Sequence, residues 1–576
     1  MESFPENAIE RAGPQAPSVA DDPALGLSIR AKLEILGAVL LGMFLSALDQ
    51  TIVGPVLPKI VSDLHGSDVY TWAVTIYLLT STVTVPIYGK LSDLYGRKPI
   101  LMIGITLFLA GSALSGLSQE MWQLVLFRGI QGLGAGALFP IALAIIGDLF
   151  TPAERGKYQG LFGLVFGVAF LAGPAIGGTL TDNFSWHAIF YVNLPIGAIA
   201  LAVIWRLLPN IKHSERVGRI DYAGVVTLTL GLVPLLIGFT VAENSSLGFT
   251  DPYFWLWVGA GVLFLAIFVW VERRSPEPVI PLRLFRNRTF SASMLAIFFA
   301  TFGFGAVIIF LPLYFLIVQG VSYTQSGYQL LPFMFGLILA SITSGQLVAR
   351  TGRYKPYILI GLVLLIIGMG LMTQLRAGTD PLMLSAWMFI AGLGVGPTFA
   401  VFTIIVQNAV DFKDLGAATS DLTLFRQIGT TVGIAAAFSL FRLNFTWGLL
   451  HDQLVAAGAP AQFVPTTPPA GFDPGAITNV SGNGATDFLA QVPDKFQPVF
   501  IEGFHQALTI AIANSIWLGV AASAIALVAA FGLKEIPLRR TQQSAAAQHA
   551  ADAAAGAAGA AAAQAGHGVR PRPAAD

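Results

Sequence analysis

Residues Gly89 to Ile100 read GKLSDLYGRKPI and form a charged hinge between two long apolar runs. The frame G-x-L-x-x-x-x-G-R returns at Gly345, where GQLVARTGRYKPYI again separates two apolar runs. The glycine run at 132–136 is likewise repeated at 392–396. The duplicated charged turn predicts a membrane protein built from two related halves, an arrangement common among transporters.

The composition also indicates a lipid environment. Of the 576 residues, 55% are hydrophobic and 11% are charged, whereas about 25% are charged in an ordinary soluble domain. The formal net charge is zero, so nothing suggests nucleic-acid binding. The chain has no cysteine, which excludes disulfides, thiolate metal sites and thiol catalysis. The polar N-terminus also lacks the pattern of a cleaved signal peptide.

Fourteen apolar runs have the length of about 20 residues that a helix needs to cross a bilayer. An even number places both termini on the same side. The runs lie near residues 35–58, 70–88, 99–118, 122–147, 158–180, 187–208, 222–241, 253–271, 290–318, 327–348, 357–374, 382–408, 417–441 and 507–533.

The repeat pairs runs one to six with runs nine to fourteen, and it leaves runs seven and eight as an insert. We therefore predict an all-α polytopic fold with two six-helix bundles and two extra central transmembrane helices. The predicted segments are a cytoplasmic tail (1–32), an N-terminal bundle (33–208), two inserted helices (209–275), a C-terminal bundle (276–535) with an external loop (442–504), and a disordered cytoplasmic tail (536–576).

Lysine and arginine residues lie mostly in the two tails and in every second loop, for example at 206–219 and 273–288. By the positive-inside rule, this bias places both termini in the cytoplasm. The opposite loops hold Lys59, Arg376, Arg442 and Lys495.

The external loop at 442–504 is rich in proline, glycine and asparagine, and Phe496, Phe500 and Phe504 lead from it into the last run. We favour a solvated linker that partly covers the outer mouth over a device for capturing a partner or substrate. The alanine- and glycine-rich tail from Thr541 has the low complexity typical of disorder.

The motifs of soluble enzymes are missing. The sequence has no G-x-x-x-x-G-K-[ST] phosphate loop and no H-E-x-x-H zinc pair. We therefore expect neither an enzyme nor a cofactor. The glycine runs lie inside apolar segments, where they favour close packing of helices.

Ionisable residues inside the runs are the strongest chemical signal, because each is costly in a bilayer unless paired or hydrated. Asp49 follows Ile35 by enough residues to lie about 21 Å from the cytoplasmic edge, at a rise of about 1.5 Å per residue. Arg128 lies about 9 Å below the outer edge. In a core about 30 Å thick these depths coincide, so Asp49 and Arg128 can form an ion pair. The pair is either structural or a proton-binding carboxylate that arginine and substrate regulate.

Run thirteen contains Asp421 and Arg426, which lie about 140° apart on a helix and cannot be partners. Both residues are secondary candidates for the lining of the central cavity. Arg426 has structural and functional interpretations of equal weight, whereas Asp421 is favoured as a helix-dipole or interface charge. Glu502 and His505, at the outer end of the last run, are favoured as hydrated residues.

Run five contains GVAFLAGPAIGG at 167–178. Its glycines and proline weaken a helix and allow close packing. They indicate either packing alone or a bend where the two halves rock. The candidate bend residues are Gly167, Gly173, Pro174, Gly177 and Gly178.

Four motifs resemble those of fourteen-span drug:proton antiporters of the major facilitator superfamily. They are ALDQTIVGPVLP at 47–58, GKLSDLYGRKPI at 89–100, LVLFRGIQGLGAG at 124–136 and GVAFLAGPAIGG at 167–178. The resemblance implies proton coupling through Asp49 and Arg128, and it associates the run-five bend with export. It also implies a cytoplasmic latch formed by Gly89, Asp93, Gly96, Arg97 and Asp148.

Two positions depart from the family pattern. Trp186-His187 stands where relatives often have Trp-Arg, which puts an outer charge contact in doubt. In the second turn, Ala349 replaces the acid that Asp93 provides in the first. We therefore expect only the N-terminal half to carry the full charged latch.

The resemblance implies a proton-coupled multidrug efflux antiporter that exports lipophilic, often cationic drugs by alternating access and contributes to antibiotic resistance. The expected partners are a small lipophilic substrate, protons and membrane lipids, with no nucleic acid and a monomeric state. The expected location is a bacterial plasma membrane, crossed many times. The alternatives are a dedicated exporter of a lipid, metabolite or amino acid, and a non-transporting receptor.

Overall fold

The computed structural model describes residues 27–64, 70–210, 220–244, 248–460, 464, 466–468, 493 and 495–538. Within these ranges the chain is helical and has no strand. Fourteen of the described helical segments are long and apolar enough to cross a membrane. This confirms the predicted all-α polytopic fold.

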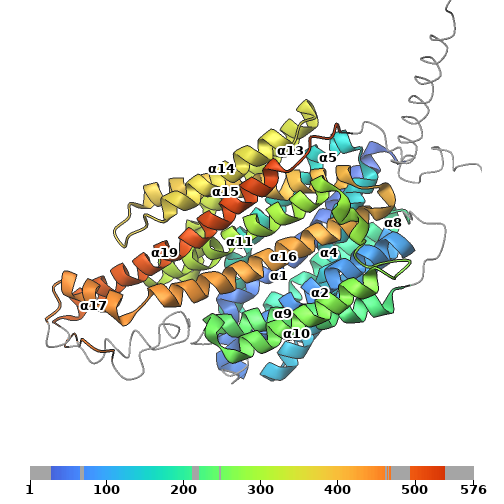
Figure 1. Cartoon of the computed structure of the whole chain (residues 1–576). Helices are drawn as coiled ribbons and strands as arrows, with labels where there is room; N and C mark the ends of the chain where they lie inside the picture. The colour runs from blue at the N-terminus through green and yellow to red at the C-terminus, as the bar shows by residue number, and fades with distance from the viewer. Residues whose placement is uncertain are drawn as a thin grey trace, which may run out of the picture.

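The N-terminal half forms the bundle at the blue and cyan end of the colour range in Figure 1. Its fifth span divides at Gly160 and its sixth at Val192. Its helices are α1 (Ile29–Leu64), α2 (Tyr70–Tyr95), α3 (Arg97–Ser115), α4 (Met121–Leu149), α5 (Pro152–Gln159), α6 (Leu161–Asn183), α7 (Ala188–Tyr191) and α8 (Asn193–Leu207).

The C-terminal half forms the bundle coloured yellow-green to red in Figure 1. Several of its helices begin at a side-chain cap; Asn287, for example, accepts hydrogen bonds from the first backbone N–H groups of α11. Its helices are α11 (Arg288–Ile317), α12 (Tyr323–Gln329), α13 (Leu331–Thr351), α14 (Lys355–Met372), α15 (Pro381–Ala409), α16 (Leu415–Asn444), α17 (Trp447–Ala456) and α19 (Gln497–Phe531).

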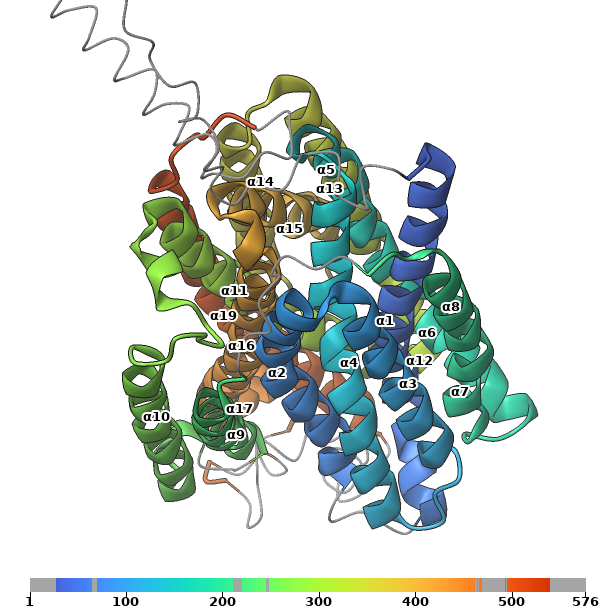
Figure 2. The same ribbon diagram turned by 90° about the vertical axis from the view of Figure 1, so that its right-hand side faces the viewer.

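The insert consists of α9 (Tyr222–Asn244) and α10 (Pro252–Glu272), a helical hairpin between the halves in sequence. Helix α9 packs against α2 of one half and α16 of the other, and both views place the green hairpin beside them (Figures 1 and 2). Only 17% of the apolar window of α10 is buried. Most of α10 therefore faces outward, toward lipid.

The two halves are packed in the same way around α4 and α15, whose apolar windows are 89% and 83% buried. In α4, a side chain at Gly132 would collide with α2, and one at Gly134 with α3. In α15, a side chain at Gly392 would likewise collide with α13, and one at Gly394 with α14. The repeated glycine runs are thus positions where neighbouring helices approach closely.

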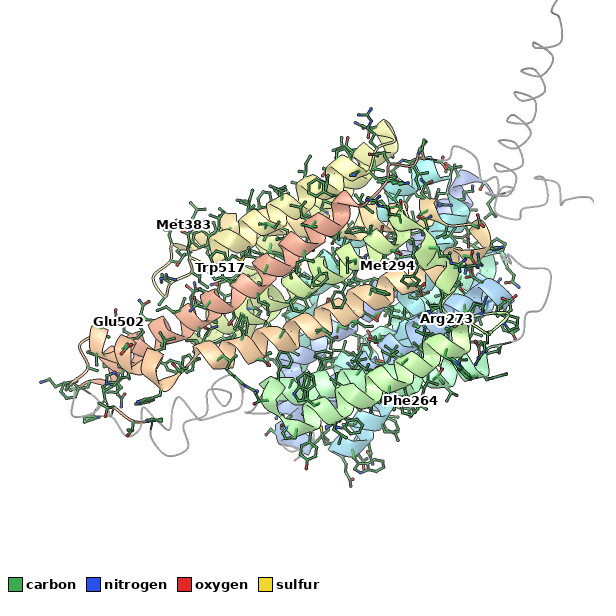
Figure 3. All side chains as sticks on the ribbon, in the orientation of Figure 1. Phe264, Arg273, Met294, Met383, Glu502 and Trp517 are labelled. Carbon is green, nitrogen blue, oxygen red and sulfur yellow. The ribbon has the colours of Figure 1, made fainter. Side chains whose placement is uncertain are left out.

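We call the end of the bundle that carries the α2–α3 turn the turn end, and the opposite end the loop end. Figure 3 shows Arg273 and Glu502 near opposite ends of the bundle, with Phe264, Met294 and Trp517 between them. Both termini of the described chain lie at the turn end. Lys32 donates to the carbonyl of Leu149 at the end of α4, and the segment after α19 contacts the α13–α14 turn.

The predicted external loop at 442–504 is wrong at both ends. Helix α16 continues to Asn444, α17 follows it, and α19 begins at Gln497. Phe500 and Phe504 are buried within α19 and belong to the hydrophobic core of the C-terminal half. The described part of this region is therefore largely helical, because its apolar side chains pack together. Residues 469–492 lie outside the described residues, as do residues 1–26 of the predicted tail at 1–32 and residues 539–576 of the predicted tail at 536–576. Helix α1 begins at Ile29, inside the predicted N-terminal tail.

Candidate functional site

A buried ion pair joins Asp49 on α1 to Arg128 on α4. Arg128 Nη1 lies 2.5 Å from Asp49 Oδ2, and the side chains of Arg128 and Asp49 are 2% and 0% exposed. The structure therefore brings together the two residues that the depth calculation placed at one level. A charge inside a bilayer is tolerated when it is paired in this way.

Polar side chains complete the environment of the pair. Asp49 Oδ1 accepts hydrogen bonds from Gln131 Nε2 at 2.8 Å and from Asn193 Nδ2 at 3.3 Å. Arg128 also donates to Gln131 Oε1 at 2.9 Å, and its guanidinium lies 4.2 Å from the centroid of the Tyr77 ring. Several hydrogen-bond donors therefore hold the carboxylate of Asp49 inside the bundle.

Sequence reasoning did not identify Gln131, Asn193 or Tyr77 as parts of this site. Gln131 follows Arg128 by three residues, so it lies on the same helix face, and that spacing is a usable signal. Asn193 starts α8, and only the fold brings it beside α1.

The predicted latch residues form one cluster at the turn end. Arg97 Nη1 lies 2.5 Å from Asp93 Oδ1, and Arg97 Nε lies 2.8 Å from Asp148 Oδ2. Gly96 links α2 to α3 with φ of 100°, a conformation that favours glycine. The turn thus points Arg97 back toward both carboxylates.

Asp93 also connects the two halves. Its carboxylate accepts hydrogen bonds from the backbone N–H groups of Gly416 at 3.1 Å and Ala417 at 2.9 Å, in the first turn of α16. A helix N-terminus carries partial positive charge and favours an anion. Gly89 lets α2 approach this turn, because a side chain there would collide with Ser420.

Two further contacts between the halves lie at the turn end. Gln159 Nε2 donates to Gln407 Oε1 at 2.7 Å, and Ser341 Oγ donates to the carbonyl of Gly160 at 3.1 Å. Together with the Asp93 contact, these bonds close the turn end in this conformation.

The second turn is built differently from the first. Arg353 is exposed, and Asn408 stands where the repeat has Asp148. The segment 533–538, which we call the C-terminal clasp, occupies this turn. The backbone N–H of Tyr354 donates to Glu535 Oε1 at 2.7 Å, and Asn408 Nδ2 donates to the carbonyl of Ile536 at 3.2 Å.

Tyr354 holds the clasp through its hydroxyl as well. The hydroxyl donates to the carbonyl of Lys534 and accepts from the N–H of Ile536, both at 2.6 Å. Burial raises the pKa of Tyr354 to about 12, so the phenol keeps its proton at neutral pH and remains a donor.

The candidate bend in run five lies in α6, which is one continuous helix through Pro174. Side chains at Gly173 or Gly177 would collide with α1, and one at Gly167 with Ile338 on α13. Gly178 is half-buried. These residues therefore place α6 in close contact with both halves.

The remaining candidates do not join the Asp49 site. Arg426 Nη2 donates to the carbonyl of Thr398 at 3.4 Å, and its guanidinium lies 4.7 Å from the centroid of the Phe399 ring. Asp421 is fully buried, and within the described chain neither of its oxygens has a hydrogen-bond partner. It is the seventh residue of α16 and so lies beyond the first turn, which does not fit the favoured helix-dipole interpretation.

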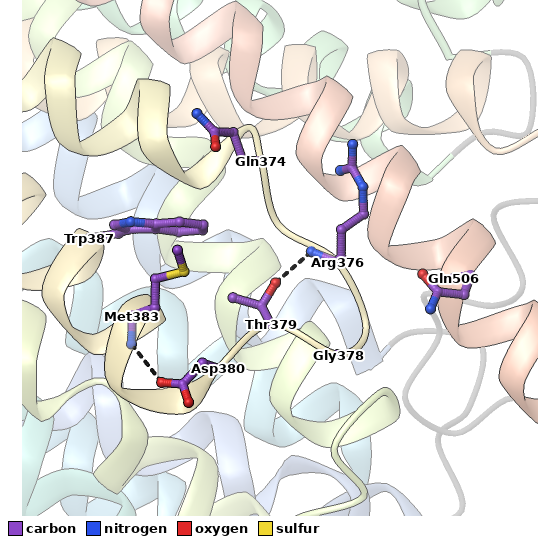
Figure 4. A pocket seen from close by; sticks show the side chains of 8 residues that line it. All are labelled: Gln374, Arg376, Gly378, Thr379, Asp380, Met383, Trp387 and Gln506. Carbon is purple, nitrogen blue, oxygen red and sulfur yellow. Dashed lines mark hydrogen bonds between the residues drawn. The ribbon is translucent and has the colours of Figure 1, made fainter.

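The loop end carries two features away from the ion pair. The ring of His187 stacks on Trp186, with centroids 3.7 Å apart. A shallow pocket lies between the α14–α15 turn and α19 and is lined by Arg376, Asp380 and Trp387, among others (Figure 4). Asp380 caps α15 within this turn. Among the described residues, no group of three or more His, Cys, Asp or Glu side chains could hold a metal ion.

Two related six-helix bundles are an architecture typical of secondary membrane transporters. The sequence profile of the Major Facilitator Superfamily matches residues 39–434, more than half of the chain. The chain belongs to this superfamily, whose members are transporters and not enzymes.

Relatives with assigned names include transporters. The chain is 39% identical over 427 residues to the multidrug transporter protein MdtP of Bacillus subtilis, covering 73% of this chain and 77% of that protein. It is 34% identical over 531 residues to an uncharacterised MFS-type transporter of Mycobacterium tuberculosis, covering 92% and 74%.

Solved structures show the same fold at low identity. The human organic anion transporter MFSD10 matches with a TM-score of 0.54 at 15% identity, covering 87% of this chain and 99% of that one. The proton:xylose symporter XylE matches with a TM-score of 0.53 at 14% identity, covering 88% and 97%.

Proposed function

We propose that this chain exports lipophilic, often cationic drugs in exchange for protons. The observation that carries the proposal is Asp49, a carboxylate buried in the N-terminal bundle and held by Arg128. The similarity to a protein named as a multidrug transporter supports the choice of drugs as the substrate class.

Asp49 would exchange a proton for a cationic substrate. The charged carboxylate of Asp49 is stabilised by Arg128, Gln131 and Asn193. Protonation of Asp49 would neutralise its side of the ion pair with Arg128. A cationic substrate would replace the proton as the positive partner. The residue then alternates between two bound cations, as antiport requires.

The latch would couple this exchange to alternating access. Asp93 binds the first turn of α16 only when the halves meet at the turn end. A ligand shifts such an equilibrium by its differential affinity for the two states. One charge moving through about 100 mV supplies about 2.3 kcal/mol, enough for roughly a fiftyfold gradient per proton.

The test is transport in proteoliposomes under an imposed pH gradient, with a panel of lipophilic cations and lipids. Asp49→Asn should lose gradient-driven transport, because it cannot exchange a proton. Asp182→Asn is the matched control, since Asp182 is an exposed acid in α6 of the same half. Full gradient-driven transport by Asp49→Asn would overturn the assignment of the coupling acid.

We also propose that the turn end faces the cytoplasm of a bacterial cell, with both termini inside, and that the monomer is the working unit. The bias of lysine and arginine toward the tails and alternate loops supports this orientation. Because the chain has no cysteine, a single Arg350→Cys variant tests it directly. An impermeant thiol reagent added to intact cells should leave that residue unlabelled.

A dedicated exporter of one metabolite is the second candidate. The chain is 34% identical over 414 residues to a protein named as the acurin A biosynthesis cluster MFS-type transporter of Aspergillus aculeatus. Transport of a single saturable compound from the panel would favour this candidate, and a broad, chemically mixed range would favour drug export. A receptor would show no gradient-dependent flux.

A further inference from the structure

Asp421 is a carboxyl group in the second turn of α16 that the mechanism above does not use. Its side chain is 0% exposed, and both oxygens lack a hydrogen-bond partner within the described chain. An ionised carboxylate is very costly in such a place, whereas the protonated form is much less so. Burial without a partner therefore favours a protonated Asp421 while the turn end is closed.

The charges around Asp421 strengthen this requirement. Carboxylates are the charged groups that act on it most strongly, and these are Glu272 at the end of α10, Asp414 before α16, and Asp93 on α2. Asp414 pairs with Arg283 and Asp93 with Arg97, so neither cation is left for Asp421.

Within the described part of the chain, the other helices that pack on α16 bring no unpaired counter-charge to Asp421. Among the charged groups of α2 and α4, Lys90 pairs with Glu277 and Asp148 with Arg97. Asp221 before α9 is another acid. The ionisable residues of the remaining neighbours α11, α15 and α19 lie toward the helix ends, and they are Arg288, Tyr314, Glu502 and His505.

The position of Asp421 ties it to the contact between the halves. Ser420, the preceding residue, faces Gly89 of α2, and Gly416 and Ala417 bind Asp93 one turn earlier. Leu424, three residues later, packs with apolar residues of α2, α9 and α10. Opening the turn end would separate α16 from α2 and would expose Asp421 to water.

We propose that Asp421 is a second proton-binding site, which keeps its proton while the turn end is closed and releases it to water when that end opens. The proposal rests on the proposed proton-coupled function and adds a second acid to it. The sign follows from linkage: the closed state binds the proton more tightly, so raising the pH favours the open state. For one proton, the open-to-closed ratio changes by up to about tenfold per pH unit.

The test measures the distance between spin labels across the turn end as a function of pH. Labels at Lys157→Cys on α5 and Arg350→Cys on α13 use exposed positions, one in each half. Every protein carries Asp49→Asn, so the remaining pH dependence does not come from Asp49. The distance measurement needs no substrate. A negative result would therefore refute the role of Asp421 without bearing on whether the chain transports drugs.

With Asp421 intact, the open fraction should rise with pH, and Asp421→Asn should remove most of that rise. Asp421→Glu should keep the rise of the open fraction with pH, because it keeps the carboxyl group. Asp411→Asn is the control: Asp411 is a nearby half-buried acid, and its replacement should leave the rise unchanged. Asp421→Ser provides the same neutral test if the Asn variant does not fold. An unaltered pH response in either neutral variant, or no pH response with Asp421 intact, would overturn the proposal.

Discussion

At the residue scale, Asp49 shows how a charge is kept inside a bundle. Its carboxylate contacts Arg128 and Gln131 from α4 and Asn193 from α8, so two other helices hold one side chain of α1. Removing one partner of a buried pair leaves an uncompensated charge, which typically costs about 3–5 kcal/mol.

We therefore expect Arg128→Met to lower the free energy of unfolding by about 3–5 kcal/mol. The double variant Asp49→Asn/Arg128→Met should recover much of that loss, because it removes both charges. Lys59→Met is the control, since the exposed Lys59–Asp63 pair should contribute less than about 1 kcal/mol. Thermal unfolding in detergent measures all three. A double variant that is no more stable than Arg128→Met would contradict the pairing argument.

Gly96 provides a second prediction at this scale, because its φ of 100° suits glycine alone. Gly96→Ala should destabilise the protein by about 1–3 kcal/mol. Gly54→Ala is the matched control, since a side chain there meets open space in a helix, where alanine is favoured. The same melting experiment checks both. Equal melting temperatures for the two variants would show that the turn tolerates a side chain.

The depth of Asp49 and Arg128 in the membrane could be predicted from the sequence, because the constant rise per residue of a helix gives depth from residue number. It could not predict Gln131 and Asn193 as partners, since uncharged polar residues also occur in spans for packing. Asp421 was visible as a charge in the sequence, but that the described chain gives it no counter-charge depends on what surrounds α16. These neighbouring groups are brought together by the packing of the whole bundle, and the sequence of one helix does not reveal them.

At the element scale, the two charged turns share a sequence frame and differ in what they bind. The first turn presents Asp93 to the N-terminus of α16. The second turn lacks that acid, and Tyr354 binds the C-terminal clasp instead. The sequence revealed the missing acid through Ala349, but it gave no sign that Glu535, far along the chain, would take a place at this turn.

This difference predicts unequal effects of two similar substitutions. A charge at a helix N-terminus contributes up to about 2 kcal/mol in partly buried geometry, so Asp93→Asn should reduce transport by about tenfold or more. Arg353→Gln should have little effect, because Arg353 is exposed and it bonds to Thr351 through its backbone N–H and carbonyl. Transport rates in proteoliposomes compare the two. Equal losses would remove the distinction between the turns.

At the scale of the whole molecule, the halves, the insert and the clasp all meet at the turn end. The insert packs through α9 on both α2 and α16, the elements that the Asp93 contact joins. The fold, the span count and the repeat could be predicted, because apolar length and repeated motifs determine them. The helical parts of 442–504 could not, since their apolar residues are interspersed with turn-forming ones.

The clasp predicts how far the C-terminus can be shortened. Truncation after Leu533 removes the groups that bind Tyr354 and Asn408, several hydrogen bonds of about 1 kcal/mol each. We expect a loss of about 3 kcal/mol or more in the free energy of unfolding. Truncation after Leu538 keeps every one of these bonds and should leave the melting temperature unchanged. Identical melting of both truncations would show that the clasp does not stabilise the bundle.

The clasp also sets an order for biosynthesis. In the N-terminal half, Arg97 and Asp148 are separated by 51 residues, so their bond can form soon after α4 leaves the ribosome. Tyr354 must wait for Glu535, 181 residues later. The second turn therefore stays incomplete until α19 and the clasp have been synthesised, and a nascent chain stalled before residue 534 would expose it to quality-control proteases.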